Sequence, residues 1–161
     1  MKAQTLFRLG GIAAVAGGAM RLGEPLLKMT FNGNALQDSY FIIDVFLLLG
    51  LIGWYAWRSE KLGVAGLIGF VSGVVGILVI RSAALFAPQG YVLGATLLLI
   101  GLVVMNTPAL IRREGPICPP LLWLIALACA LASLAYAPLA VVAGTAFGIG
   151  YIFAGVALLR A

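Results

Sequence analysis

Long apolar stretches, almost free of charged side chains, fill most of this chain of 161 residues. Only 9% of the residues are charged and 63% are hydrophobic, so there are too few polar side chains to cover the surface of a water-soluble globule. We therefore expect an all-α integral membrane protein, with membrane lipids as its surroundings. We expect a multipass protein of the bacterial inner (plasma) membrane.

The lengths of the apolar stretches predict six transmembrane helices, because a helix needs about 20 residues to cross a hydrocarbon core of about 30 Å. The predicted helices are residues 5–22, 40–57, 62–80, 90–111, 117–136 and 139–159, in one domain over residues 1–161. The last two share an uncharged stretch that must turn back, and Tyr136-Ala137-Pro138 is where a helix is least able to continue. The predicted fold is a compact bundle of three helical hairpins.

The first of these helices is the weakest prediction. Only Leu9 to Met20 lie between Arg8 and Arg21, and this segment crosses a bilayer only if both arginines extend to the interfaces. A cleaved signal peptide is one alternative, since the segment ends in the small residues Gly17-Gly18-Ala19. A helix lying on the membrane surface is the other. We expect a retained crossing helix.

The basic residues predict the orientation. With six crossings, one side receives Lys2, Arg8, Arg58, Lys61, Arg112, Arg113 and Arg160. The other side receives Arg21, Lys28 and Arg81. The positive-inside rule then places both termini in the cytoplasm. The net charge of +5 is dispersed over helix ends and forms no basic run, which argues against nucleic acid as a partner.

Aromatic residues at the helix ends fit this orientation, because Trp and Tyr favour the membrane–water interface. At the cytoplasmic side these are Trp54, Tyr55 and Trp57, and at the outer side Tyr40, Tyr91 and Tyr136. We expect all six rings at headgroup level.

Glycines recur at helical spacing on two of the predicted helices. The third helix carries Gly66, Gly69, Gly73 and Gly76, and the sixth carries Ala140, Gly144, Gly148 and Gly155. Small residues allow two helix backbones to approach closely, so both faces predict close helix packing. The contact is made either inside the monomer, which we favour, or with other membrane subunits or a second copy of the chain.

Asp44 is the only acidic residue within an apolar stretch, about one turn from the outer end of its predicted helix. A charge at that depth is costly unless it is paired. Arg21 and Arg81 end their helices on the same side, so an ion pair between Asp44 and one of them is the preferred interpretation. Proton or cation coupling and a shallow, hydrated carboxylate are the alternatives.

Two further polar segments have a structural interpretation. Asn106-Thr107-Pro108 predicts a kink or a frayed helix end, in which Asn106 or Thr107 bonds to the neighbouring backbone. Gly23 to Ser39 forms the longest connection and is expected to lie flat on the membrane or to cover the outer mouth of the bundle.

The sequence offers no catalytic group, metal site or cofactor motif. It contains no histidine, and Cys118 and Cys129 are too far apart on one predicted helix to form a disulfide. We therefore expect a non-catalytic accessory, scaffold or assembly subunit of a larger membrane complex. The alternative is a small transporter or channel for an apolar or weakly polar solute, coupled through Asp44. An intramembrane enzyme is the least favoured class.

Overall fold

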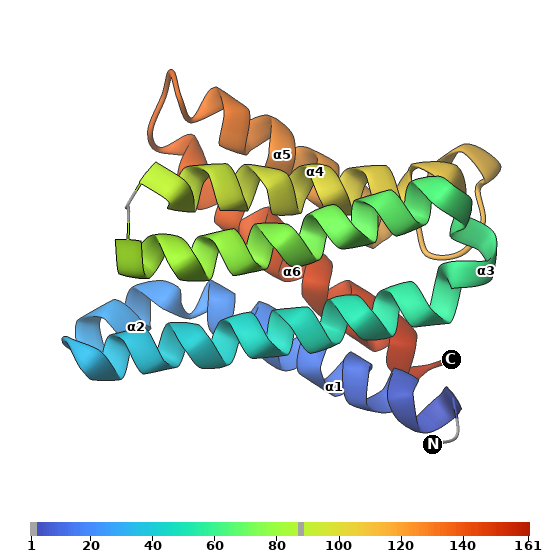
Figure 1. The fold of residues 1–161 in the computed structure, drawn as a ribbon, viewed down its shortest axis with the longest axis horizontal. Helices are drawn as coiled ribbons and strands as arrows, with labels where there is room; N and C mark the ends of the chain where they lie inside the picture. The colour runs from blue at the N-terminus through green and yellow to red at the C-terminus, as the bar shows by residue number, and fades with distance from the viewer. Residues whose placement is uncertain (1–2, 87–88) are drawn as a thin grey trace.

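The structure, a computed structural model, describes residues 3–86 and 89–161, and all regular secondary structure in these residues is helical (Figure 1). The helices are α1 (Ala3–Leu22), α2 (Glu24–Thr30), α3 (Asn34–Phe86), α4 (Gln89–Arg112), α5 (Cys118–Ala132) and α6 (Leu139–Leu159). The prediction of an all-α fold is confirmed.

Helix α3 contains two of the predicted helices and the connection between them. It is 53 residues long and is broken at Gly63, whose φ of 60° and ψ of −156° are not helical. Figure 1 shows that its two arms are antiparallel: the chain runs to this bend along the first arm and returns along the second. The predicted connection at residues 58–61 is instead helical, because the chain reverses at Gly63, in a backbone region that is essentially restricted to glycine.

Among the described residues, three helical stretches are long and apolar enough to cross a membrane, namely Asn34–Ala83, Gly90–Arg112 and Leu139–Leu159. The first of these contains the bend at Gly63 and therefore supplies two arms. Helix α5 is shorter than predicted, with 15 residues in place of residues 117–136, because the chain leaves the helix at Ser133 and turns towards Pro138.

The predicted outer connection, residues 23–39, is also more ordered than a loop. Most of it belongs to α2 and to the first turns of α3, and only Gly23 and Phe31 to Gly33 lie outside a helix. Gly33 has a φ of 57°, so Asn32-Gly33-Asn34 forms the turn between α2 and α3.

Different segments of the chain form the two ends of the bundle. Both termini, the bend of α3 and the α4–α5 connection lie at one end, which we call the Gly63 end (Figure 1). Helix α2 and the α5–α6 connection lie at the opposite end, which we call the α2 end (Figure 1).

Helix α1 is held between α3 and α6 by pairs of adjacent glycines. A Cβ atom on Gly10 would lie 2.8 Å from the Cα of Gly53 in α3, and one on Gly18 would lie 2.6 Å from the carbonyl oxygen of Gly148 in α6. Gly11 meets Gly155 of α6 in the same way, at 2.9 Å. Since only glycine permits these approaches, the segment with the weakest apolar pattern is an integral part of the bundle.

A row of aromatic rings fills the core between α3, α5 and α6. Ring centroids are 5.5 Å apart from Trp57 to Trp54, 5.8 Å from Trp54 to Trp123 and 5.5 Å from Trp123 to Tyr151. Phe147 follows at 4.9 Å from Tyr151. Trp54, which we expected at headgroup level, is only 1% exposed and is part of this core.

Candidate functional site

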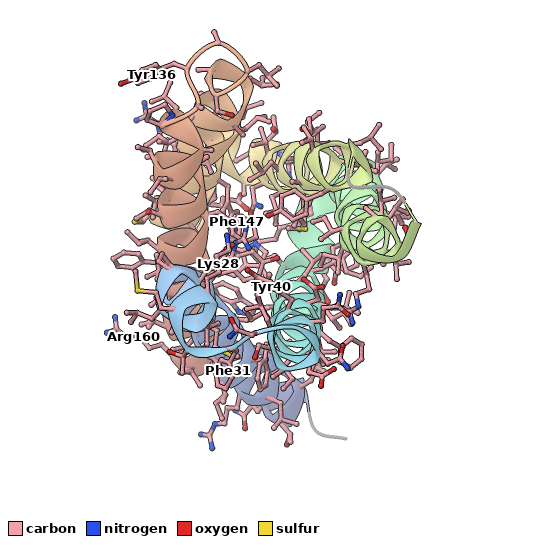
Figure 2. All side chains as sticks on the ribbon, turned by 90° about the vertical axis from the view of Figure 1, so that its left-hand side faces the viewer. Lys28, Phe31, Tyr40, Tyr136, Phe147 and Arg160 are labelled. Carbon is pink, nitrogen blue, oxygen red and sulfur yellow. The ribbon has the colours of Figure 1, made fainter. Side chains whose placement is uncertain are left out.

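The α2 end contains a cavity of about 420 Å³ between α1, α2, α3, α4 and α6. Its charged lining residues are Arg21, Glu24, Lys28, Asp44 and Arg81. Its other polar lining residues are Gln37, Tyr40 and Tyr91. Its apolar lining residues are Ile43, Leu47, Ile77, Ile80, Leu98 and Phe147. Figure 2 looks onto this end, and the side chains of Lys28, Tyr40 and Phe147 gather near the middle of the view, whereas Tyr136 lies at its edge.

Glu24 is the centre of the polar contacts in this cavity. Its Oε2 atom lies 2.5 Å from Nη1 of Arg21, and its Oε1 atom lies 2.9 Å from Nζ of Lys28. The hydroxyl of Tyr40 donates a hydrogen bond to the same Oε1 atom at 3.3 Å. One carboxylate therefore connects the end of α1, the helix α2 and the first turns of α3.

These contacts shift the pKa values of the two charged groups on α2. Burial acts to raise the pKa of Glu24, but the charge of Arg21 and the hydrogen bond from Lys28 outweigh it and hold this pKa below the usual range. The hydrogen bond with Glu24 raises the pKa of Lys28. Both groups are thus charged at neutral pH.

Arg21 extends the same network to α4. Its Nη2 atom donates a hydrogen bond to the hydroxyl of Tyr91 at 2.5 Å, while Nη1 contacts Glu24. Tyr40 and Tyr91, which we expected at headgroup level, both face partners in the cavity.

The structure brings Asp44, Arg21 and Arg81 into this one cavity but forms no direct pair between them. Arg21 is paired with Glu24, and within residues 3–86 and 89–161 no cationic nitrogen lies within 4.0 Å of the Asp44 carboxylate. Arg81 donates to the carbonyl oxygen of Gln37 at 3.4 Å and lies over the ring of Phe41, 5.0 Å from its centroid. The ion pair predicted for Asp44 is therefore absent as a direct contact.

A second polar group lies in the core near the Gly63 end, and we call it the Asn106 cluster: Trp54, Arg58, Asn106 and the carbonyl of Glu114. Trp54 Nε1 and Arg58 Nη1 donate hydrogen bonds to Oδ1 of Asn106 at 3.0 and 3.2 Å. Arg58 Nη2 donates to the carbonyl oxygen of Glu114 at 2.6 Å. Asn106 is fully buried and Arg58 is 4% exposed, so the cluster fixes α3 to α4 and to the chain that follows α4.

The hydrogen bonds expected within the Asn106 segment are formed. Asn106 Nδ2 donates to the carbonyl oxygen of Leu102 at 2.8 Å, and the Thr107 hydroxyl donates to that of Val103 at 2.8 Å. The helix does not fray here, since α4 continues through Pro108 to Arg112. The role of Asn106 towards α3 was missed, although Trp54 and Arg58 stand one helical turn apart in the sequence.

The glycines singled out in the sequence occupy different surroundings. A Cβ atom on Gly69 or Gly76 would lie 2.3 or 2.5 Å from a backbone nitrogen of α4. On Gly73 or Gly66 the nearest atoms would belong to side chains of α3, those of Leu51 and Leu62. Gly148 faces α1, whereas around Gly144 the described residues leave the space within 4 Å open.

The remaining candidate groups form no further site. In the described part of the chain, no three His, Cys, Asp or Glu side chains are arranged to hold a metal ion. Cys118 is exposed, and Cys129 is partly buried; both are free thiols. Comparisons of the chain with protein-family models, with curated proteins and with solved structures give no match.

Proposed function

We propose that the protein is a multipass protein of the bacterial inner membrane that binds a small, partly apolar solute in the cavity at the α2 end and carries it across the membrane. The observation that supports this proposal is the cavity itself. Its volume of about 420 Å³ lies within the range of small-molecule sites, and its lining combines an apolar surface with a few polar side chains, as such sites do.

The arrangement of the helices supports a membrane-spanning assembly with six crossings. The two arms of α3 supply two crossings, and α1, α4, α5 and α6 supply the others. Most of the described arginines and lysines then belong to the Gly63 end, which by the positive-inside rule is cytoplasmic. The cavity at the α2 end would open towards the outside.

An accessory role in a larger membrane complex is the second candidate, and Gly144 is the observation that favours it. Gly144 stands one turn from the exposed Ala140 on α6, and no described atom occupies the space next to it. Two small residues at this spacing suit close contact with a helix of another subunit.

Filling the cavity tests the proposed function. Leu98 lines the cavity and is 3% exposed, whereas Leu93 lies on the same helix and is 63% exposed. We expect a panel of small organic solutes to contain at least one that stabilises the purified protein against heat and enters reconstituted vesicles. Leu98→Trp should abolish both effects, and the matched variant Leu93→Trp should retain them.

Ile77→Phe is a milder cavity-filling variant for the case that Leu98→Trp does not fold, as judged by size-exclusion chromatography. Binding that persists in a folded cavity-filled variant would disprove a role for the cavity. A panel in which nothing binds to the parent protein would do the same.

A further inference from the structure

The charges that line the cavity do not balance. Three cationic side chains, those of Arg21, Lys28 and Arg81, face two carboxylates, those of Glu24 and Asp44. Two of the cations share Glu24 as their partner. The third, Arg81, has a carbonyl oxygen at 3.4 Å as its polar partner among the described residues. The cavity therefore carries an excess of positive charge.

Hydrogen-bond donors also exceed acceptors in this cavity. Each guanidinium group has five N–H donors. Arg21 engages one N–H on each of its two terminal nitrogens, and Arg81 engages one N–H with the carbonyl of Gln37, so both keep donors for a ligand. The Asp44 carboxylate has no cationic nitrogen within 4.0 Å among the described residues. A ligand group rich in acceptors and negatively charged complements this set, because a guanidinium group binds carboxylates and phosphates in a bidentate manner.

The rest of the lining selects against a bare inorganic anion. Ile43, Leu47, Ile77, Leu98 and Phe147 form an apolar surface in the same cavity. An apolar group gains free energy when it leaves water for such a surface, in proportion to the area that it buries. A ligand that uses the whole cavity thus has an anionic head and an apolar body.

We propose that the cavity binds a small organic anion, a carboxylate or phosphate attached to an apolar or aromatic body, with Arg81 as the main partner of the anionic head. This inference rests on the proposed function, since it names the class of solute that the cavity takes. Asp44 lies in the same cavity and repels an anion, so it limits the affinity and favours release.

Four probes with one common body test the charge of the ligand: benzoate, phenyl phosphate, benzylamine and benzyl alcohol. Binding is measured by isothermal titration calorimetry to the protein in nanodiscs of zwitterionic lipid. We expect benzoate or phenyl phosphate to bind at least about tenfold more tightly than benzylamine and benzyl alcohol, a difference of about 1.4 kcal/mol. Inorganic phosphate, which lacks the apolar body, should bind more weakly than phenyl phosphate.

Three variants identify the groups involved. Arg81→Gln should weaken binding of the anionic probe about tenfold or more, while Arg160→Gln, which removes the same charge at an exposed position outside the cavity, should leave it unchanged. Asp44→Asn should strengthen anion binding. Unchanged affinity in folded Arg81→Gln would overturn the proposal, as would weaker binding in Asp44→Asn.

The outcomes separate this inference from the proposed function. Preferential binding of benzylamine or benzyl alcohol, abolished by Leu98→Trp, would overturn the anionic assignment and leave the solute-binding cavity intact. Failure of all probes and of the wider panel would overturn both. Anionic phospholipid added to the nanodiscs distinguishes two sources of the head group: competition with benzoate identifies a lipid head group, and no competition identifies a soluble anion.

Discussion

Asn106 makes buried side-chain hydrogen bonds between α4 and α3. Its Oδ1 atom accepts hydrogen bonds from Trp54 and Arg58, both of which are buried. Asn106→Leu leaves these two donors without their acceptor, and a buried donor without a partner costs more than the bond itself contributed. We expect the free energy of unfolding in detergent to fall by about 2 kcal/mol.

Thr107→Val is the matched control for this prediction. Thr107 is exposed, and its hydroxyl bonds only to the backbone of its own helix. We expect this variant to unfold within about 0.5 kcal/mol of the parent. Equal losses in the two variants would show that Asn106 acts through α4 alone and that its bonds to α3 contribute nothing.

The lowered pKa of Glu24 predicts that the stability of the protein depends on pH. The Glu24 pKa is lowered in the folded protein, so its contribution is complete above the ordinary carboxyl value of 4.5 and is lost as the pH falls through the lower, folded value. Thermal unfolding of the parent should therefore lose stability below about pH 4.5, by at most about 1 kcal/mol from this group. Glu24→Gln should be less stable at pH 7 and should show a smaller loss on acidification. An identical acid profile in both proteins would contradict this role.

Some contacts of single residues are predictable from the sequence, and others are not. The chain spacing placed Asp44, Arg21 and Arg81 at the same end, and the structure brings them into one cavity. The spacing does not predict that Arg21 forms its ion pair with Glu24, because this pair depends on where α2 lies. The position of Trp54 near a helix end predicts an interfacial ring, but contacts with Trp123 of α5 and Asn106 of α4 place it in the core.

At the scale of helices, glycine contacts decide how closely α3 and α4 approach. A Cβ atom on Gly69 would lie 2.3 Å from the backbone nitrogen of Met105, and backbone cannot move aside as a side chain can. Gly69→Ala should cost about 1 to 3 kcal/mol in the free energy of unfolding. Gly73→Ala, which meets the flexible Leu51 side chain at 3.1 Å, should cost less.

Gly144→Ala completes this series as a control, since no described atom lies within 4 Å of the added carbon. We expect no loss of stability, because alanine also favours the helix over glycine. A loss as large as that of Gly69→Ala would show that another chain covers Gly144, in support of the accessory role.

The limits of the helices were predictable where the signal is local. The turn before Pro138 and the turn at Gly33 follow from residue types that leave a helix. The bend at Gly63 was missed, because charged residues at positions 58–61 marked a connection while glycines recur throughout this part of the chain. Only the backbone shows which glycine has a positive φ.

At the scale of the molecule, hydrophobic lengths and basic residues predicted the order of hairpins, and the structure places both termini at one end of the bundle (Figure 1). The cavity was not predictable in this way. Its lining comes from five helices, and it exists because their side chains leave a gap when they pack, which no single segment encodes.

If the chain crosses the membrane six times, as proposed, the α2 end and the Gly63 end are accessible from opposite sides. Asn34 is exposed at the first end and Glu60 at the second, so single cysteines at these positions report on the two sides. In a background of Cys118→Ser and Cys129→Ala, an impermeant thiol reagent added to intact cells should label Asn34→Cys only, and inverted vesicles should expose Glu60→Cys only. Labelling of both cysteines from the same side would show that the first arm of α3, which separates them, does not cross the membrane. The proposed topology, in which the cavity opens to the outside, would then be wrong.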